Sequence, residues 1–237
     1  MPTELVFRAD AYQTSCPARV VGLDEKGIVL DRTVFYATSG GQPGDSGQLR
    51  RADGATIALS TAVFTDSAKT IIAHVPAPGA ELPAIGEAVT VEIDWGPRFN
   101  RMRMHTALHL LSVVLPYPVT GGSVSDGESR LDFDIPDAGL DKDAIAAKLN
   151  ALIATDAGVS ERYISEAELD ANPALVKTMS VQPPRGAGTI RLVEIAGLDL
   201  QPCGGTHVRR TSEIGRVEIG KIENKGRQNR RVTITLA

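Results

Sequence analysis

The stretch that decides the fold is residues 96–118, GPRFNRMRMHTALHLLSVVLPYP, where the pattern of the chain changes from strand to helix. Pro97 suits the first turn of a helix, where its missing N–H group is not needed. Pro116 and Pro118 cannot continue a helix, so they mark its end. We therefore predict a helix over residues 98–115.

Upstream of this helix the chain has the pattern of short β-strands. Val89, Val91 and Ile93 alternate with polar residues, which is the period of a half-buried strand. Glu25-Lys26-Gly27 separates the first two runs and predicts a hairpin turn. Strands at this spacing predict a small β-barrel or sandwich. The predicted strands are residues 19–23, 28–32, 56–64, 70–75 and 88–95.

Downstream of the helix, strands and helices mix without a regular β-α-β alternation, which predicts an α+β fold. A second helix is predicted over residues 141–154, with Asp141 as its N-cap. We place the domain boundary near Gly96, which gives a β-rich domain, residues 1–96, and an α+β domain, residues 97–237. Further strands are predicted at residues 129–135, 159–165, 189–195, 215–222 and 230–236.

The composition is that of an ordinary globular chain, with 42% hydrophobic and 23% charged residues in 237. No apolar run approaches the roughly 20 residues of a membrane span, so no membrane partner is expected. The N-terminus lacks the basic and apolar regions of a signal peptide. Two cysteines, Cys16 and Cys203, exclude a disulfide scaffold and favour a reducing, cytoplasmic location.

Four residues with soft ligand atoms fall into two pairs. His105 and His109 share one face of the predicted helix, because residues four apart lie roughly 5–6 Å from each other there. Cys203 and His207 flank a glycine-rich segment. Three imidazoles and a thiolate form a donor set that zinc prefers. Each pair alone also fits residues with no shared role, but the two together favour a metal site. His74 and Cys16 lack partners and are interpreted as structural.

The helix pair has the sequence His-Thr-Ala-Leu-His, with no glutamate after His105. Metalloproteases of the zincin type place their general base at that position. A peptidase of that type is therefore not expected.

Charge is distributed unevenly along the chain. The net charge is −4, yet the segment from Arg209 to Arg231 holds eight basic and three acidic residues, a local charge of +5. No acidic residue lies between Asp94 and Asp126, a stretch with three arginines. A basic segment in an acidic chain fits a polyanion bound at one face, and it equally fits a solvated strand face.

Several motifs, in order over nearly the whole chain, resemble the editing domain of alanyl-tRNA synthetases. They are His-Thr-Ala-Leu-His-Leu-Leu at 105–111, Cys-Gly-Gly-Thr-His-Val at 203–208, Arg-Thr-Ser-Glu-Ile-Gly at 210–215, Asn-Lys-Gly at 224–226, Phe-Tyr at 35–36 and Gly-Gly-Gln-Pro-Gly-Asp-Ser-Gly at 40–47. Free-standing forms of this module make up the AlaX family. The β-rich N-terminal portion, without a C-terminal extension, resembles the medium-length AlaX type.

The resemblance implies a zinc-dependent deacylase that hydrolyses the ester of serine, and sometimes glycine, wrongly attached to alanine tRNA. It implies that His105, His109, Cys203 and His207 hold the zinc. It also suggests that Thr120 lines the amino-acid pocket, with Ser123 as a second candidate. Turn chemistry is the alternative for both residues, since Gly-Gly flanked by Thr and Ser is a common loop.

The glycine-rich loop contains Gly40, Gly41 and Gln42, which we expect near the editing pocket, where the loop couples the two domains. A tight β-turn with Pro43 is the alternative. The Gly-Gly-Gln tripeptide also occurs in peptide-release factors, and we treat that match as coincidence.

Basic residues next to the two metal motifs are the expected contacts for the tRNA acceptor end, since Lys and Arg hold phosphates without regard to sequence. They are Arg98, Arg101, Arg103, Arg209 and Arg210.

No obligate protein partner is evident. Three rival functions are weighed: a zinc-stapled RNA-binding module without catalysis, a zinc hydrolase of another small ester or amide, and complete aminoacylation, which is disfavoured because no activation motif is seen. The sequence does not decide whether serine or glycine is preferred or whether the acceptor stem is recognised. It also leaves open the number of metal ligands, the identity of any general base and the oligomeric state.

Overall fold

The computed structural model describes residues 1–136, 139–179, 183, 186 and 188–237. The chain forms two compact units, Met1–Phe99 and Asn100–Ala237. Helix α2, Trp95–Val114, contributes its first residues to one unit and the remainder to the other. Within the described ranges, no helix combines the length and the apolar character needed to cross a membrane.

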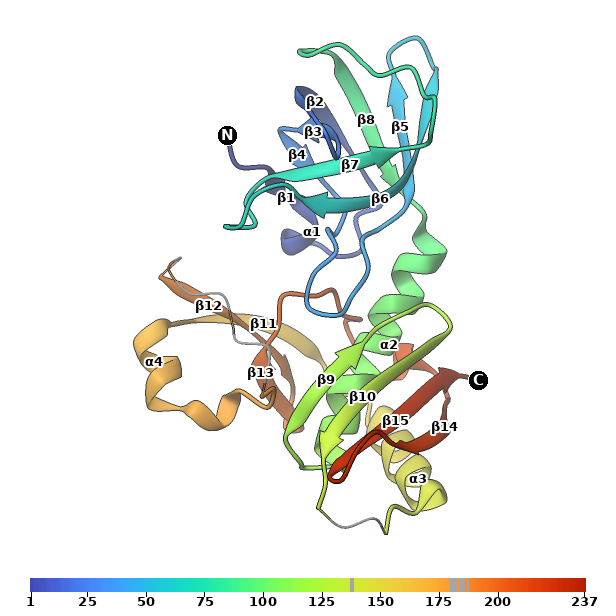
Figure 1. Cartoon of the computed structure of the whole chain (residues 1–237), viewed down its shortest axis with the longest axis vertical. Coiled ribbons are helices and arrows are strands. Elements are labelled where there is room, and N and C mark those ends of the chain that lie inside the picture. The colour runs from blue at the N-terminus through green and yellow to red at the C-terminus, as the bar shows by residue number, and fades with distance from the viewer. Residues whose placement is uncertain (137–138, 180–182, 184–185, 187) are drawn as a thin grey trace. The chain divides into compact units, whose positions relative to one another are not determined.

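The first unit is built around a closed six-stranded barrel, drawn in blue, cyan and green in Figure 1. Its strands follow the order β2-β3-β7-β6-β5-β8 and are all antiparallel. Their bounds are β2 Ser15–Asp24, β3 Gly27–Leu30, β5 Gly47–Arg51, β6 Thr56–Phe64, β7 Ile72–Pro76 and β8 Ala88–Ile93. This closed order confirms the predicted barrel, and core residues such as Val91 and Leu49 are fully buried.

The hairpin between β2 and β3 shows how tightly this barrel is packed. Asp24 pairs with Gly27, so Glu25 and Lys26 form the turn. Gly27 has a φ of 146°, and a Cβ there would lie 2.1 Å from the carbonyl oxygen of His74. Only glycine fits at this crossing of β3 with β7.

Short elements and the glycine-rich loop complete the first unit. β1, Glu4–Leu5, pairs in parallel with β4, Arg32–Thr33, and α1 spans Val6–Ala9. In the loop, Ser39 and Gln42 exchange two backbone hydrogen bonds of 3.1 and 2.9 Å. Gly40 and Gly41 between them have φ of 57° and 82°. Two positive φ values in a two-residue turn are the type I′ geometry that glycine favours. The tight turn therefore centres on the two glycines.

The second unit carries two sheets (Figure 1). One has the order β14-β15-β10-β9 and the other β11-β12-β13. The strands are β9 Val119–Ser123, β10 Glu128–Asp134, β11 Val159–Ser165, β12 Thr189–Ile195, β13 Asp199–Pro202, β14 Val217–Asn224 and β15 Asn229–Leu236. The helices are α3 Lys142–Ile153 and α4 Glu166–Ala171, with single 3₁₀ turns at η1 Pro173–Leu175 and η2 Thr211–Ile214.

Local chemistry explains several of these bounds. Asp141 caps α3 by accepting hydrogen bonds from the backbone of Asp143 and Ala144, as predicted. The Thr-Gly-Gly-Ser segment at 120–123 is a strand rather than a turn: Gly122 pairs with Leu131 on β10. A Cβ at Gly122 would lie 2.9 Å from the Leu131 side chain, so glycine permits this close pairing.

Candidate metal centre

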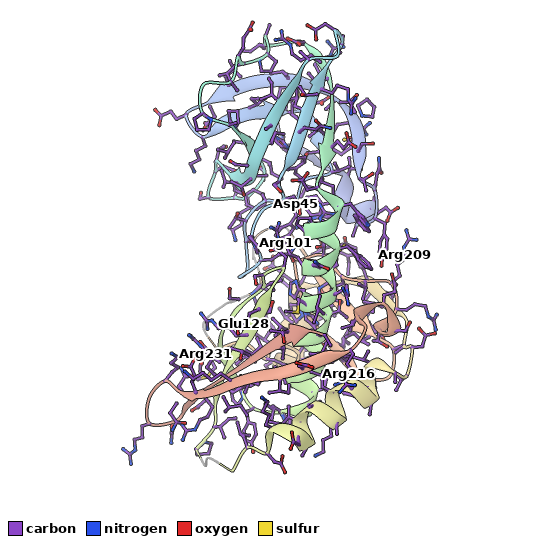
Figure 2. All side chains as sticks on the ribbon, turned by 90° about the vertical axis from the view of Figure 1, so that its right-hand side faces the viewer. Asp45, Arg101, Glu128, Arg209, Arg216 and Arg231 are labelled. Atoms are coloured by element: carbon purple, nitrogen blue, oxygen red, sulfur yellow. The ribbon has the colours of Figure 1, made fainter. Side chains whose placement is uncertain are left out.

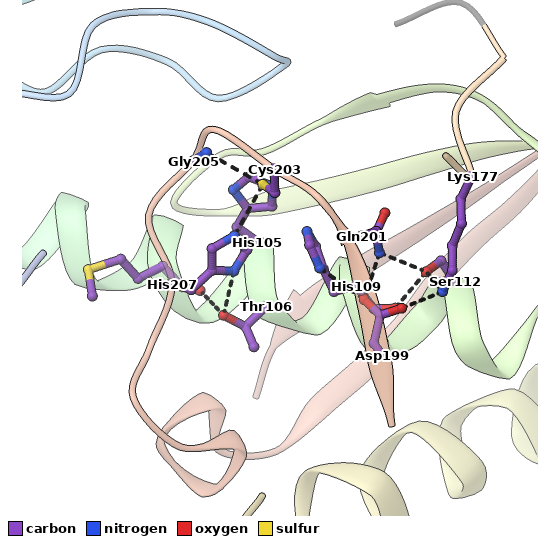
Figure 3. Close-up of polar contacts among 11 residues, drawn as sticks. His105, Thr106, His109, Ser112, Lys177, Asp199, Gln201, Cys203, Gly205 and His207 are labelled. Carbon is purple, nitrogen blue, oxygen red and sulfur yellow. Dashed lines mark hydrogen bonds and ion pairs between the residues drawn. The ribbon is translucent and has the colours of Figure 1, made fainter. Parts of the chain in front are cut away.

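Four side chains from two distant parts of the second unit converge on one point (Figure 3). His105 and His109 lie one turn apart on α2, whereas Cys203 and His207 come from the loop after β13. One ligand atom from each residue lies within 4.8 Å of all the others. The two pairs predicted from the sequence are therefore brought together.

The spacing of the ligand atoms fits a zinc ion. Sγ of Cys203 lies 3.4 Å from Nε2 of His105 and 3.2 Å from Nε2 of His207. In a tetrahedral zinc site, bonds of about 2.0–2.3 Å place neighbouring nitrogen and sulfur ligands about 3.5 Å apart. The donor set and its dimensions both suit zinc.

In two of the histidines, Nδ1 is hydrogen-bonded to another side chain. Nδ1 of His109 lies 3.1 Å from Oδ2 of Asp199. Nδ1 of His207 lies 3.1 Å from Oγ1 of Thr106, whose own hydroxyl donates to the Met102 carbonyl. Both rings therefore hold a proton on Nδ1 and leave Nε2 for a metal, which is the usual arrangement around a zinc site.

Asp199 lies in a network of its own on the side of His109 away from the cluster (Figure 3). Lys177 Nζ contacts Oδ1 of Asp199 at 2.5 Å, and the Gln201 amide donates to Oδ2 at 2.7 Å. Lys177 also lies 3.3 Å from the hydroxyl of Ser112, which donates to the carbonyl of His109. None of these residues was predicted from the sequence, because only the path of β13 brings Asp199 to α2.

Electrostatics in the cluster follow from burial and close charge. Burial alone would raise the pKa of Cys203, but the neighbouring His105 and His207 lower it well below its usual range. Burial lowers the pKa of His109, yet the hydrogen bonds to Asp199 and Cys203 outweigh it and raise the value to about 9. The pKa of His207 falls to about 3 through burial and the charge of His105. Metal binding needs the thiolate and neutral rings, so a metal would have to displace the proton on Nε2 of His109.

The loop that carries Cys203 is held by a buried arginine. Arg191 on β12 donates to the carbonyl of Cys203 at 2.5 Å and to that of Gly205 at 3.1 Å. Its guanidinium is also paired with Glu161 on β11. The three-stranded sheet thereby fixes the backbone at the second metal motif.

Comparison with known proteins places this site in a family. Residues 190–233 match the second additional domain of threonyl and alanyl tRNA synthetases, and residues 6–96 match the class II (A) tRNA synthetases. The alanyl-tRNA editing protein AlaX-M of Methanosarcina mazei is 36% identical over 99% of this chain and 96% of its own length. That of Saccharolobus solfataricus is 32% identical over 99% of both chains. The chain belongs to the AlaX-M family.

An alanine–tRNA ligase of Pyrobaculum aerophilum is 34% identical over 93% of this chain, which spans 25% of that enzyme. The matches to AlaX-M proteins confirm the resemblance that the motifs indicated.

His74 and Cys16, the histidine and cysteine outside the two motifs, are buried in the barrel unit.

The residues assigned to the amino-acid pocket by the AlaX resemblance both lie on β9. Thr120 donates its hydroxyl to the carbonyl of Asp132 at 3.1 Å. Both Thr120 and Ser123 are half-buried. In the glycine-rich loop, Gly40 and Gly41 are exposed, whereas Gln42 is only 1% exposed.

The arginines near the first metal motif differ in burial. Arg98 is fully buried, donates to the carbonyls of Ala11 and Val34, and is paired with Asp45. It has no surface from which to contact a phosphate, so we withdraw it from the predicted tRNA contacts. Arg101 is 9% exposed and lies 3.3 Å from Asp126.

The other predicted tRNA contacts lie in the second unit. Arg103 is half-buried and donates to the carbonyl of Ile214 at 2.8 Å. Arg209 and Arg210 are exposed, and Arg210 is paired with Asp156. Figure 2 shows Arg209 and Arg231 on different sides of this unit, so the basic segment does not form one continuous patch.

Proposed function

We propose that this protein is an editing deacylase that hydrolyses the ester of serine, or glycine, on mischarged alanine tRNA. The observation that carries the proposal is the convergence of His105, His109, Cys203 and His207 in a chain similar along its whole length to alanyl-tRNA editing proteins. When bound, zinc supplies Lewis-acid polarisation or a water of lowered pKa. The same four residues would hold it.

A separate editing site has a physical reason. A synthetase pocket for alanine cannot strongly reject serine, which only adds a hydroxyl, or glycine, which is smaller. The editing pocket must instead bind the serine hydroxyl. The oxygen of Thr120 has two lone pairs, so it can accept a hydrogen bond from that hydroxyl while it donates its own to the backbone carbonyl of Asp132. Ser123 on the same strand is the second candidate.

The test is deacylation of seryl-, glycyl- and alanyl-tRNA by purified protein, with and without a chelator. We expect hydrolysis of seryl-tRNA, loss of activity with the chelator, and recovery with zinc. Cys203→Ala and His105→Ala should each lower activity at least a hundredfold and reduce bound zinc, because each removes a ligand atom from the cluster.

The chain contains a matched control for the cysteine variant. Cys16, the second cysteine, is buried in the barrel unit and belongs to no metal cluster among the residues that the structure describes, so Cys16→Ala should keep both zinc and activity. Full activity of the metal-free protein would refute zinc dependence.

A tRNA-binding module with a structural zinc site and no catalytic activity is the second candidate. Four protein ligands make a closed set, which is typical of structural zinc sites. That function predicts tRNA binding without turnover of seryl-tRNA, and the same assay separates the two.

A further inference from the structure

Asp199 is a buried carboxylate in direct contact with the ring of one candidate ligand. Its side chain is fully buried, and its Oδ2 lies 3.1 Å from Nδ1 of His109. A carboxylate buried to this degree is retained only where its charge is compensated. We infer that Asp199, held by Lys177 and Gln201, is the positioning residue that presents Nε2 of His109 to the metal. The inference rests on the proposed metal-dependent function.

Three donors surround the two oxygens of Asp199. Oδ1 receives the Lys177 ammonium at 2.5 Å, and Oδ2 receives both the Gln201 amide at 2.7 Å and Nδ1 of His109. These partners come from α2, β13 and the segment before residue 180, so the carboxylate cannot turn away without breaking two other contacts. The imidazole therefore has one orientation and one tautomer.

His207 provides an internal comparison. Its Nδ1 meets the neutral hydroxyl of Thr106, which also accepts from the backbone of Val208 at 3.3 Å. The hydroxyl orients the ring but brings no charge. The carboxylate behind His109 both orients the ring and makes it a more basic ligand, which is the recurrent carboxylate–histidine–metal arrangement. Of these two histidines, His109 therefore depends more on its partner.

Asp199→Asn is the decisive variant, because an amide cannot satisfy three donors. If its NH₂ group faces Lys177, it meets an ammonium. If the NH₂ group faces His109, the ring must accept at Nδ1 and carry its proton on Nε2, where the metal binds. We expect the zinc affinity to fall 10- to 100-fold, the usual range for loss of such a partner. Lys177→Met leaves His109 and Asp199 in contact, so we expect a smaller fall of about threefold to tenfold.

The measurement is the zinc dissociation constant by competition with a chelating dye, together with nitrogen NMR of the histidines in the zinc-loaded protein. The wild type should carry its His109 proton on Nδ1, and Asp199→Asn should weaken or lose that signal. Asp132→Asn is the matched control: Asp132 is another buried, ion-paired carboxylate of the second unit, bonded to Arg231 and Arg130. Its zinc affinity should stay within twofold of the wild type.

Each outcome decides the inference. Zinc affinity within twofold of the wild type in Asp199→Asn overturns it and leaves the metal site standing. An equal loss in Asp132→Asn overturns it as well, since the effect is then general destabilisation. If Asp199→Asn does not fold, Lys177→Met decides, and unchanged affinity there overturns it. A wild-type protein without zinc affinity refutes the proposed metal site together with this inference.

Discussion

His74 illustrates how one side chain makes the barrel sensitive to pH. The ring is fully buried, with Nδ1 at 3.0 Å from the carbonyl of Ile28 and Nε2 at 2.7 Å from the hydroxyl of Thr33. Nδ1–H donates a hydrogen bond to the carbonyl and Nε2 accepts one from the hydroxyl, so both nitrogens of the neutral ring have a hydrogen-bond partner. Burial lowers the pKa of His74 from 6.5 to about 4. Protonation therefore favours the unfolded chain.

The expected effect is a loss of stability on acidification. The unfolded state binds a proton below pH 6.5, and the folded state does so only near pH 4, so stability is complete above 6.5 and falls between these values. With about 1.4 kcal/mol per pH unit, the loss from His74 is roughly 3 kcal/mol. Urea unfolding followed by the fluorescence of Trp95, the one tryptophan of the chain, reports on this unit.

The control is His74→Gln, which is neutral across this range. The variant is expected to be less stable at neutral pH, but its stability should lack the steep fall between pH 6.5 and 4. Parallel pH profiles for the variant and the wild type would show that another group causes the change.

Among single residues, the two metal-ligand pairs could be predicted from the sequence, whereas the residues that hydrogen-bond to the ligand histidines could not. His105 and His109 share a helix face by their spacing, and Cys203 and His207 are soft ligands four residues apart; only the two pairs together predicted the metal site. Asp199 lies in a sequence with no motif, and its role depends on β13 passing beside α2. Thr106 lies inside the helix motif, yet its contact with His207 spans 101 residues.

At the scale of elements, α2 has two different environments along its length. Its first turn belongs to the barrel unit, where Arg98 is fully buried with Asp45, and its middle carries the metal motif. Charge in the sequence suggested the same role for Arg98 and Arg101. Their burial separates them: removing one partner of a buried ion pair leaves an uncompensated charge, whereas a half-exposed pair contributes little.

Arg98→Met should therefore lower the free energy of unfolding of the barrel unit by about 3–5 kcal/mol. Arg50→Met is the matched control within the same unit, because the side chains of Arg50 and its partner Glu92 are 51% and 40% exposed. We expect it to change stability by less than about 1 kcal/mol. Unfolding monitored at Trp95 distinguishes the two, and equal effects would mean that the buried pair is not what stabilises this unit.

Element types were predictable where periodicity was strong. The helices at α2 and α3 and the long barrel strands match the expected ranges within a few residues. Elements without a strong pattern were missed: β9 has the composition of a turn, and β13 is only four residues long. In both, pairing with the adjacent strand of a hairpin decides the structure, and strand preference depends more on such pairing than on local composition.

At the scale of the whole molecule, the net charge of −4 does not show how many basic groups of the basic segment stay available for a polyanion. Within the basic segment, Lys221 and Lys225 are paired with Glu223, and Arg231 is paired with Asp132. Glu223 is already counted in the local charge of +5, so the acidic residues from outside the segment, Asp132 with Arg231 and Asp156 with Arg210, lower it only to +3. Arg209, exposed and two residues after His207, is the best placed of the predicted tRNA contacts.

Binding of tRNA should accordingly weaken with salt. Each phosphate contact contributes close to one unit to the slope of log affinity against log salt, so two contacts give about a tenfold loss between 50 and 200 mM. Arg209→Ala should reduce the slope by about one unit. Arg231→Ala should leave it unchanged, because Asp132 already neutralises that guanidinium. The Michaelis constant for seryl-tRNA at several salt concentrations measures both slopes. A constant that does not vary with salt in the wild type would contradict phosphate binding, and equal slopes in the two variants would move the contact away from Arg209.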